Sequence, residues 1–263
     1  MKDTVRKPRA LPNDADTGVD YSTAVAVPGA LKGSATMSVQ TRQAQSLVRG
    51  RSESAATPDA KAKYAIIGLV RFGFNMNRMW EAARADDPYA DWFLIRMTEA
   101  LTEARQDVTD KLAWVQGVLK SMPAIHVDVG NSSAPVSVPL YFTNPYGYMG
   151  AYLLSDYDHL VRAALTAKHV ALTSTAKANE IIQDGGRRVR SAYALSGAWR
   201  NFTVTRADIR QNTQRAQQAR AAMGALPDDI LAGTWRAEVA PQVRKQAVEA
   251  DQAPADTSLA SVG

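Results

Sequence analysis

The feature that most constrains the fold of this chain is an apolar run between residues 97 and 122 that steps by threes and fours. It consists of Met97, Leu101, Ala104, Val108, Leu112, Val115, Leu119 and Met122. This near-heptad spacing places apolar side chains on one face of a helix, and that face must pack against another element. Asp86, Asp87 and Pro88 have the residue types that begin a helix. We therefore predict a long helix that ends before Pro123.

A second helical pattern precedes this one. Thr57 and Pro58 have the residue types of an N-cap and a first helical turn, and apolar residues continue from there to about Ala85. Two long helices joined by a short break predict an antiparallel αα-hairpin.

Alternating segments predict three strands. In residues 34–41, Ala35, Met37 and Val39 lie on one face and polar residues lie on the other, as in a half-buried strand. A short helix is predicted to follow, over residues 42–49, with Gly50 as its stop. Residues 125–129 and 136–142 also alternate, with a turn sequence between them, so they predict a small β-hairpin.

The remaining sequence predicts a C-terminal helical layer. We expect helices that start near Ser155 and Ser174, the second interrupted at Gly185-Gly186, and a last helix over residues 205–224. Six aromatic residues fall within residues 141–157, which we call the Tyr-rich segment. We interpret it as a tight turn that packs on the helical layer, and a stacking platform is the alternative. The predicted class is α+β and mostly α.

Composition suggests where the domain begins and ends. Residues 1–30 and 246–263 are rich in small and polar residues without a sustained period, so we expect two flexible tails. Residues 31–245 then form a single domain. No stretch of 18 apolar residues occurs, and the N-terminus lacks an apolar signal region. We therefore expect a cytoplasmic protein without a membrane partner.

The sequence offers little for catalysis. These 263 residues contain no cysteine and lack the common phosphate-binding, nucleophile and zinc-protease motifs. Asp156, Asp158 and His159 cluster, and we interpret the acids as first-turn helix residues rather than metal ligands. We expect no catalytic site, no metal and no cofactor, and hence not an enzyme.

Basic residues concentrate in two segments of a chain with a net charge of +5. The first contains Lys32, Arg42, Arg49 and Arg51 and no acid. The second, which we call the second basic surface, contains Arg187, Arg188, Arg190, Arg206, Arg210, Arg215 and Arg220. Such segments are either solvated faces or nucleic-acid surfaces.

The strand at 34–41 allows a specific hypothesis. In a β-ribbon that reads DNA, strands from two chains pair and enter the major groove with their polar face outward. On this strand the polar face carries Thr36, Ser38 and Gln40, with Arg42 after it, and all four would contact base edges. We assign Lys32, Arg49 and Arg51 to the phosphates. The alternative is an ordinary strand with one solvated face.

Several longer stretches resemble the AcaB-like family. They are residues 145–172, which begin PYGYMGAYLLSDYDHL, residues 38–45 (SVQTRQAQ), residues 65–69 (AIIGL) and residues 86–92 (DDPYADW). Members of this family are encoded on integrating conjugative elements and conjugative plasmids, and its namesake is a ribbon-helix-helix activator of plasmid transfer genes. The resemblance covers about residues 30–240. It implies one AcaB-like domain over 31–245, with a ribbon-helix-helix element over 31–85.

Three hypotheses follow. In the first, the chain is a homodimeric, sequence-specific DNA-binding regulator of a mobile element's transfer genes. In the second, it is a non-enzymatic accessory protein of an integrating conjugative element, acting through contacts with other conjugative-element proteins at the αα-hairpin or the Tyr-rich segment. In the third, the second basic surface binds double-stranded DNA without sequence preference.

Overall fold

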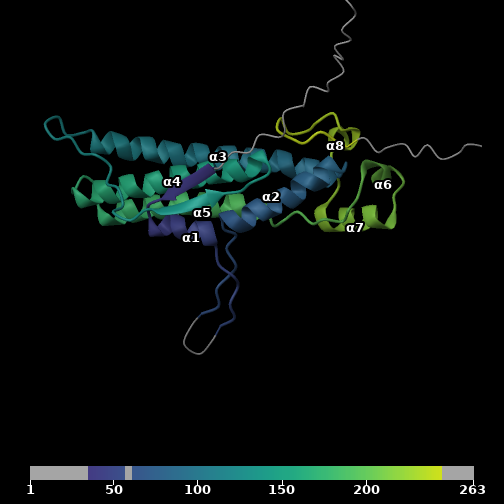
Figure 1. Ribbon diagram of the computed structural model, residues 1–263, viewed down its shortest axis with the longest axis horizontal. Helices are drawn as coiled ribbons and strands as arrows, with labels where there is room; N and C mark the ends of the chain where they lie inside the picture. The colour runs from purple at the N-terminus through teal and green to yellow at the C-terminus, as the bar shows by residue number, and fades with distance from the viewer. Residues whose placement is uncertain (1–34, 57–60, 245–263) are drawn as a thin grey trace, which may run out of the picture. The chain divides into compact units, whose positions relative to one another are not determined.

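The computed structural model describes residues 35–56 and 61–244, which lie within a single unit of the chain (Figure 1). The elements follow in the order β1 (Ala35–Val39), α1 (Arg42–Arg49), α2 (Leu69–Arg84), α3 (Pro88–Leu119), β2 (Val136–Leu140), α4 (Pro145–His169), α5 (Thr175–Leu195), α6 (Arg206–Arg210), α7 (Gln214–Met223) and α8 (Asp228–Ala232). The class is α+β and mostly helical, as predicted.

The predicted apolar seam forms the inner face of α3 as far as Leu119, whereas Met122 lies beyond the helix and is exposed. Met97, Leu101 and Val108 are buried along it. Asp87 caps the helix, because its Oδ1 accepts hydrogen bonds from the backbone N–H groups of Tyr89 and Ala90 at 2.9 and 3.1 Å. Helix α4 covers the seam and also packs against α1, α2 and α5, so it forms the centre of the fold.

Helix α2 begins at Leu69, so the predicted start at Thr57 is wrong. The proposed N-cap falls in residues 57–60, which lie outside the described residues. The residues on either side are exposed, and Tyr64 is 83% exposed. The helix therefore starts later than the residue types at 57 and 58 indicated. The exposed side chains before it have no packing partner among the described residues that would stabilise a helix there.

Between α1 and α2 the chain forms an extended arm, which we define as the described residues from 51 to 66. Arg51 and Ile66 exchange two backbone hydrogen bonds at its base, at 2.9 and 2.7 Å. Gly50 ends α1, as predicted, with φ at 71°. A Cβ on Gly50 would overlap the Ile66 carbonyl oxygen, so the base of the arm can close only because this residue is glycine.

The predicted β-hairpin is replaced by a sheet of two distant strands. β1 and β2 pair antiparallel, with Met37 opposite Val138. Residues 125–129, the predicted first strand of the hairpin, are not a strand, and Ile125 is 58% exposed. Alternation specifies the two faces of a strand but does not specify its partner, and the long-range pairing between β1 and β2 prevails.

Helix α4 begins at Pro145, so its predicted start at Ser155 is wrong. The Asn144 side chain accepts a hydrogen bond from the backbone N–H of Gly147 at 3.2 Å and thereby caps the helix. Much of the Tyr-rich segment therefore belongs to the first turns of α4, in which Tyr157 is buried. The predicted tight turn is therefore wrong, and the packing interpretation holds for the buried Tyr146 and Tyr157 but not for Tyr141, which is 83% exposed.

Helix α5 runs without interruption through Gly185 and Gly186, contrary to the prediction. A Cβ on Gly185 would lie 2.9 Å from Leu160 Cδ2, and one on Gly186 would lie 2.8 Å from the Tyr157 hydroxyl. The two glycines therefore allow α5 to approach α4 closely rather than ending the helix. The last predicted helix is divided into α6 and α7, and Asn212 between them adopts a φ of 51°.

Candidate nucleic-acid interface

The two faces of β1 differ as the sequence predicts. Met37 and Val39 are only 7% and 2% exposed and belong to the hydrophobic core. Thr36 and Ser38 are exposed on the opposite face. Both hydroxyls are therefore accessible to a molecule that approaches this face of the sheet.

Gln40 follows the strand and is partly buried. Its side-chain Oε1 accepts a hydrogen bond from the backbone N–H of Ser132 at 3.0 Å. A bidentate contact with adenine requires both the carbonyl oxygen and the amide group of a glutamine. Gln40 would have to release Ser132 to make that contact, whereas Thr36 and Ser38 would not need to rearrange.

The junction between β1 and α1 is fixed to α4 by Asp158. Its Oδ1 accepts hydrogen bonds from the backbone N–H and the hydroxyl of Thr41, at 2.9 and 2.6 Å. Its Oδ2 accepts one from the backbone N–H of Gln40 at 2.9 Å. Thr41 in turn caps α1 by accepting from Ala44 N–H at 3.2 Å. A buried carboxylate therefore holds the strand and the helix in one orientation.

Helix α1 displays two exposed arginines, Arg42 and Arg49. They lie seven residues apart, which corresponds to about two turns and about 10 Å along the helix. Arg42 follows the strand, and Arg49 lies at the entrance of a cleft. Lys32, the remaining residue of the first basic segment, lies outside the described residues.

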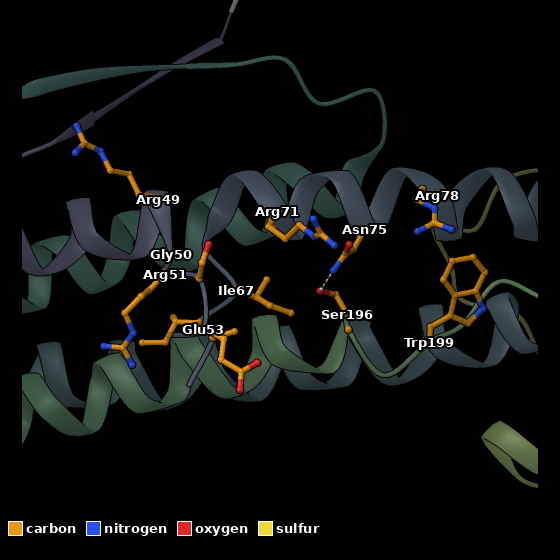
Figure 2. Close-up of a pocket in the computed structure, with 14 residues that line it drawn as sticks. Arg49, Gly50, Arg51, Glu53, Ile67, Arg71, Asn75, Arg78, Ser196 and Trp199 are labelled. Atoms are coloured by element: carbon orange, nitrogen blue, oxygen red, sulfur yellow. Dashed lines mark hydrogen bonds between the residues drawn. The ribbon is translucent and has the colours of Figure 1, made fainter. Parts of the chain in front are cut away.

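An open basic cleft of about 670 Å³ lies between the base of the arm, α2 and the C-terminal end of α5. Four arginines line it, namely Arg49, Arg51, Arg71 and Arg78. Glu53 is the one acid among the lining residues. Figure 2 shows Arg49 and Arg51 at one end, Arg71 between, and Arg78 at the other end near Trp199. The arginines form a row, which suits an extended polyanion better than a compact anion.

Neighbouring groups orient three of these arginines. Arg51 donates from Nε and Nη2 to the Tyr64 carbonyl oxygen, at 3.1 and 3.0 Å, across the arm. The guanidinium carbons of Arg71 and Arg78 lie 5.7 and 6.0 Å from the centre of the Phe74 ring, within the range of a cation–π contact.

The floor of the cleft joins α2 to the end of α5. Asn75 Nδ2 donates to Ser196 Oγ at 3.1 Å (Figure 2). Ser196 Oγ in turn donates to the Tyr193 carbonyl oxygen at 2.7 Å. These hydrogen bonds hold α2 and the C-terminal end of α5 together at the floor of the cleft.

Sequence reasoning missed Arg71 and Arg78. Both fall within an apolar helical pattern that we interpreted only for its packing. Their seven-residue spacing, which places them on one face of α2, was the available signal. Their proximity to Arg49 and Arg51 depends on the arm and has no signature in the sequence.

The second basic surface is less basic than its sequence suggests. Arg187 and Arg188 are exposed but form ion pairs with Asp184 and Asp107, each at 3.1 Å. Arg190 is partly buried. The remaining members Arg210, Arg215 and Arg220 are exposed on α6 and α7.

Arg206 does not belong to that surface, which corrects the prediction. It is only 5% exposed and forms ion pairs with Asp86 and Asp91. Burial lowers the pKa of Arg206, but the hydrogen bonds with these two carboxylates outweigh that effect and raise it overall. Its charge is neutralised inside the fold, so it is not accessible to DNA.

Comparisons with known proteins agree with this fold. A family model described as "Transcriptional regulator AcaB" matches residues 27–244. Among solved structures, the chain is similar to selenomethionine-containing AcaB from uropathogenic E. coli, with a TM-score of 0.52 and 13% sequence identity, over 76% of this chain and 95% of that chain. No curated protein matches the chain. Over the described residues, no helix is long and apolar enough to span a membrane.

Proposed function

Because the chain belongs to the AcaB family of transcriptional regulators, we propose that it binds duplex DNA sequence-specifically. The observation that carries this proposal is that exposed polar and basic side chains occur on three successive parts of the chain, namely β1, α1 and the base of the arm that lines the cleft. In this proposal Thr36 and Ser38 contact base edges, with Arg42 and Gln40 beside them. The cleft arginines contact backbone phosphates. Base contacts specify a site, and phosphate contacts position the protein on it.

We propose that the DNA-binding form is a homodimer in which β1 of one copy pairs with β1 of the other. In the described part of the chain β1 has one strand partner, β2, along one of its two edges. Pairing through the other edge would place the two β1 strands at the centre of a four-stranded sheet. In this arrangement the two central β1 strands would be the part of the sheet that contacts the major groove, whose width admits a two-stranded β-ribbon.

The proposed targets are the transfer genes of a mobile element, as the resemblance to the AcaB-like family implies. In this proposal the protein acts by binding DNA and not by catalysis. The second basic surface is the alternative DNA contact, and it receives less support because two of its arginines are paired with acids and one is buried.

Fluorescence anisotropy of the purified chain tests this proposal. Promoter-region DNA of the source element is compared with scrambled DNA over a series of salt concentrations, and sedimentation velocity gives the oligomeric state. We expect a dimer and about a thousandfold preference for the promoter DNA. Equal affinity for both DNAs with a steep salt dependence would favour the second basic surface. Absence of binding to either DNA would contradict the proposal and favour an accessory protein that contacts other proteins.

A further inference from the structure

A second depression lies between α2 and the segment that joins β2 to α4. It has a volume of about 510 Å³ and is bounded by Leu69–Asn77 of α2 and Val138–Asn144. None of its twelve lining residues is charged, and most are apolar. We call it the apolar groove.

The floor of the groove is built around Phe142. A Cβ on Gly73 of α2, or on Gly147 of α4, would overlap the Phe142 side chain, so the ring lies against both glycines. Its edge also meets Tyr148, with ring centres 5.5 Å apart. Thr143 Oγ1 donates to Asn77 Oδ1 at 2.6 Å and joins the two walls. These contacts form the groove before any partner binds.

Large apolar side chains are nevertheless exposed along the groove. Val70 is 65% exposed, Phe74 is 55% exposed and Tyr141 is 83% exposed. Single exposed apolar residues are common on proteins, but a contiguous group around a preformed groove is typical of a protein-interaction site. The volume of the groove is sufficient for a few side chains of a partner segment but not for a whole domain.

Charge beside the groove defines its partner. Arg71 and Arg78 lie on the same helix, and both guanidinium groups are near the exposed Phe74 ring that lines the groove. The groove itself has no charged lining residue, and these two arginines, which line the neighbouring basic cleft, are the charged groups beside Phe74. A segment with apolar side chains for the groove and carboxylates for the two arginines satisfies both features.

We propose that the apolar groove binds an acidic, amphipathic segment of a partner protein. Val70 and Tyr141 contact the apolar side chains of that segment, and Arg71 and Arg78 contact its carboxylates. The groove is separate from β1, but Arg71 and Arg78 are also proposed phosphate contacts, so the partner segment and DNA compete for these two arginines.

Selection from a phage-displayed library of random 16-residue peptides, with the whole chain as target, tests the inference. We expect the enriched peptides to combine apolar residues at helical spacing with Asp or Glu. A fluorescein-labelled copy of the most enriched peptide is then titrated with protein. Failure to enrich any peptide, or enrichment of basic peptides, would overturn the proposal.

Variants locate the binding site. Val70→Ser and Tyr141→Ser should each weaken peptide binding at least tenfold. Val136→Ser is the matched control, because Val136 is an exposed apolar residue of β2 outside the groove. Unchanged binding in both groove variants would contradict the inference.

Two further readouts separate the alternatives. Val70, Tyr141 and Val136 are all exposed, so the three variants should unfold at the same temperature as the wild type. A lower unfolding temperature would distinguish a folding defect from the loss of a binding contact. DNA affinity should also be unchanged in the groove variants, which keeps this result independent of the proposed DNA function. Conversion of a dimer to a monomer by Val70→Ser would identify a second copy as the occupant and overturn the proposal.

Discussion

Arg206 donates a hydrogen bond from Nη2 to Asp91 Oδ2 at 2.6 Å, although the two residues lie 115 positions apart. Arg236 donates to the other oxygen, Oδ1, at 2.7 Å, so both carboxylate oxygens are engaged. Asp91 is fully buried in the first turn of α3. This network attaches the segment after α5 to the turn between α2 and α3.

Asp91→Asn should destabilise the protein by about 3 kcal/mol, because it removes the carboxylate that pairs with Arg236 and leaves the buried Arg206 with Asp86 alone. Guanidinium chloride unfolding measures the change. Asp184→Asn is the matched control, since Asp184 pairs with Arg187 at the surface and should cost less than about 1 kcal/mol. Equal and small effects would show that the buried network contributes little.

Asp87 should make stability depend on pH. Burial raises the pKa of its carboxyl group to about 7. The native state therefore binds a proton that the unfolded state has released between about pH 4 and pH 7. Over that window the contribution of Asp87 to the free energy of unfolding falls as pH rises. Above it the ionised, buried carboxylate destabilises the fold by an amount on the order of 1–4 kcal/mol.

Asp87→Asn tests this expectation, because asparagine retains an oxygen that can cap α3 but does not ionise. Unfolding free energies measured from pH 4 to pH 8 should show a weaker fall with pH in the variant. At pH 8 the variant should be at least as stable as the wild type. A variant that is clearly less stable at pH 8 would mean that the ionised carboxylate is favourable.

Close packing between helices should make Gly150 intolerant of alanine. A Cβ at Gly150 of α4 would lie 2.5 Å from Cε1 of the buried Phe72 ring, which stacks on Tyr193 and cannot move freely. We expect Gly150→Ala to destabilise by about 1–3 kcal/mol. Gly117→Ala in α3 is the control, since no atom lies within 4 Å of its Cβ, and it should stabilise by up to about 1 kcal/mol. Thermal unfolding distinguishes the two.

The cleft arginines should control the salt dependence of DNA binding. Arg71→Ala and Arg78→Ala should each reduce the slope of log affinity against log salt by about 0.9, equally for promoter and scrambled DNA. Arg210→Ala, an exposed member of the second basic surface, should leave the slope unchanged. The opposite result would move the phosphate contacts from the cleft to α6 and α7.

The exposed hydroxyls of β1 should control sequence preference. Thr36→Ala and Ser38→Ala should each lower the preference for promoter over scrambled DNA, by about 0.5–1.5 kcal/mol for one lost hydrogen bond, and leave the salt slope unchanged. Gln40→Ala should also relax the preference. Competition anisotropy with base-substituted DNA measures these changes. Equal loss of affinity for both DNAs would indicate that these residues contact the backbone.

Features governed by local spacing could be predicted from the sequence. The alternation of β1 placed Met37 and Val39 in the core, and Gly50 ended α1. The apolar run that steps by threes and fours predicted α3, and Asp87 was among the residues predicted to begin it. These features depend on contacts within a few residues, so neighbouring side chains determine them wherever the segment lies in the fold.

The tertiary structure alone decided which distant segments meet. It paired β1 with β2, turned residues before Leu69 into an arm, and continued α5 through its glycine pair. It also brought Arg71 and Arg78 to Arg49 and Arg51, and moved Arg206 from the predicted surface into a buried network. A charge pattern records how many arginines a segment carries. Only packing determines whether a carboxylate neutralises each arginine or whether it stays accessible to a partner.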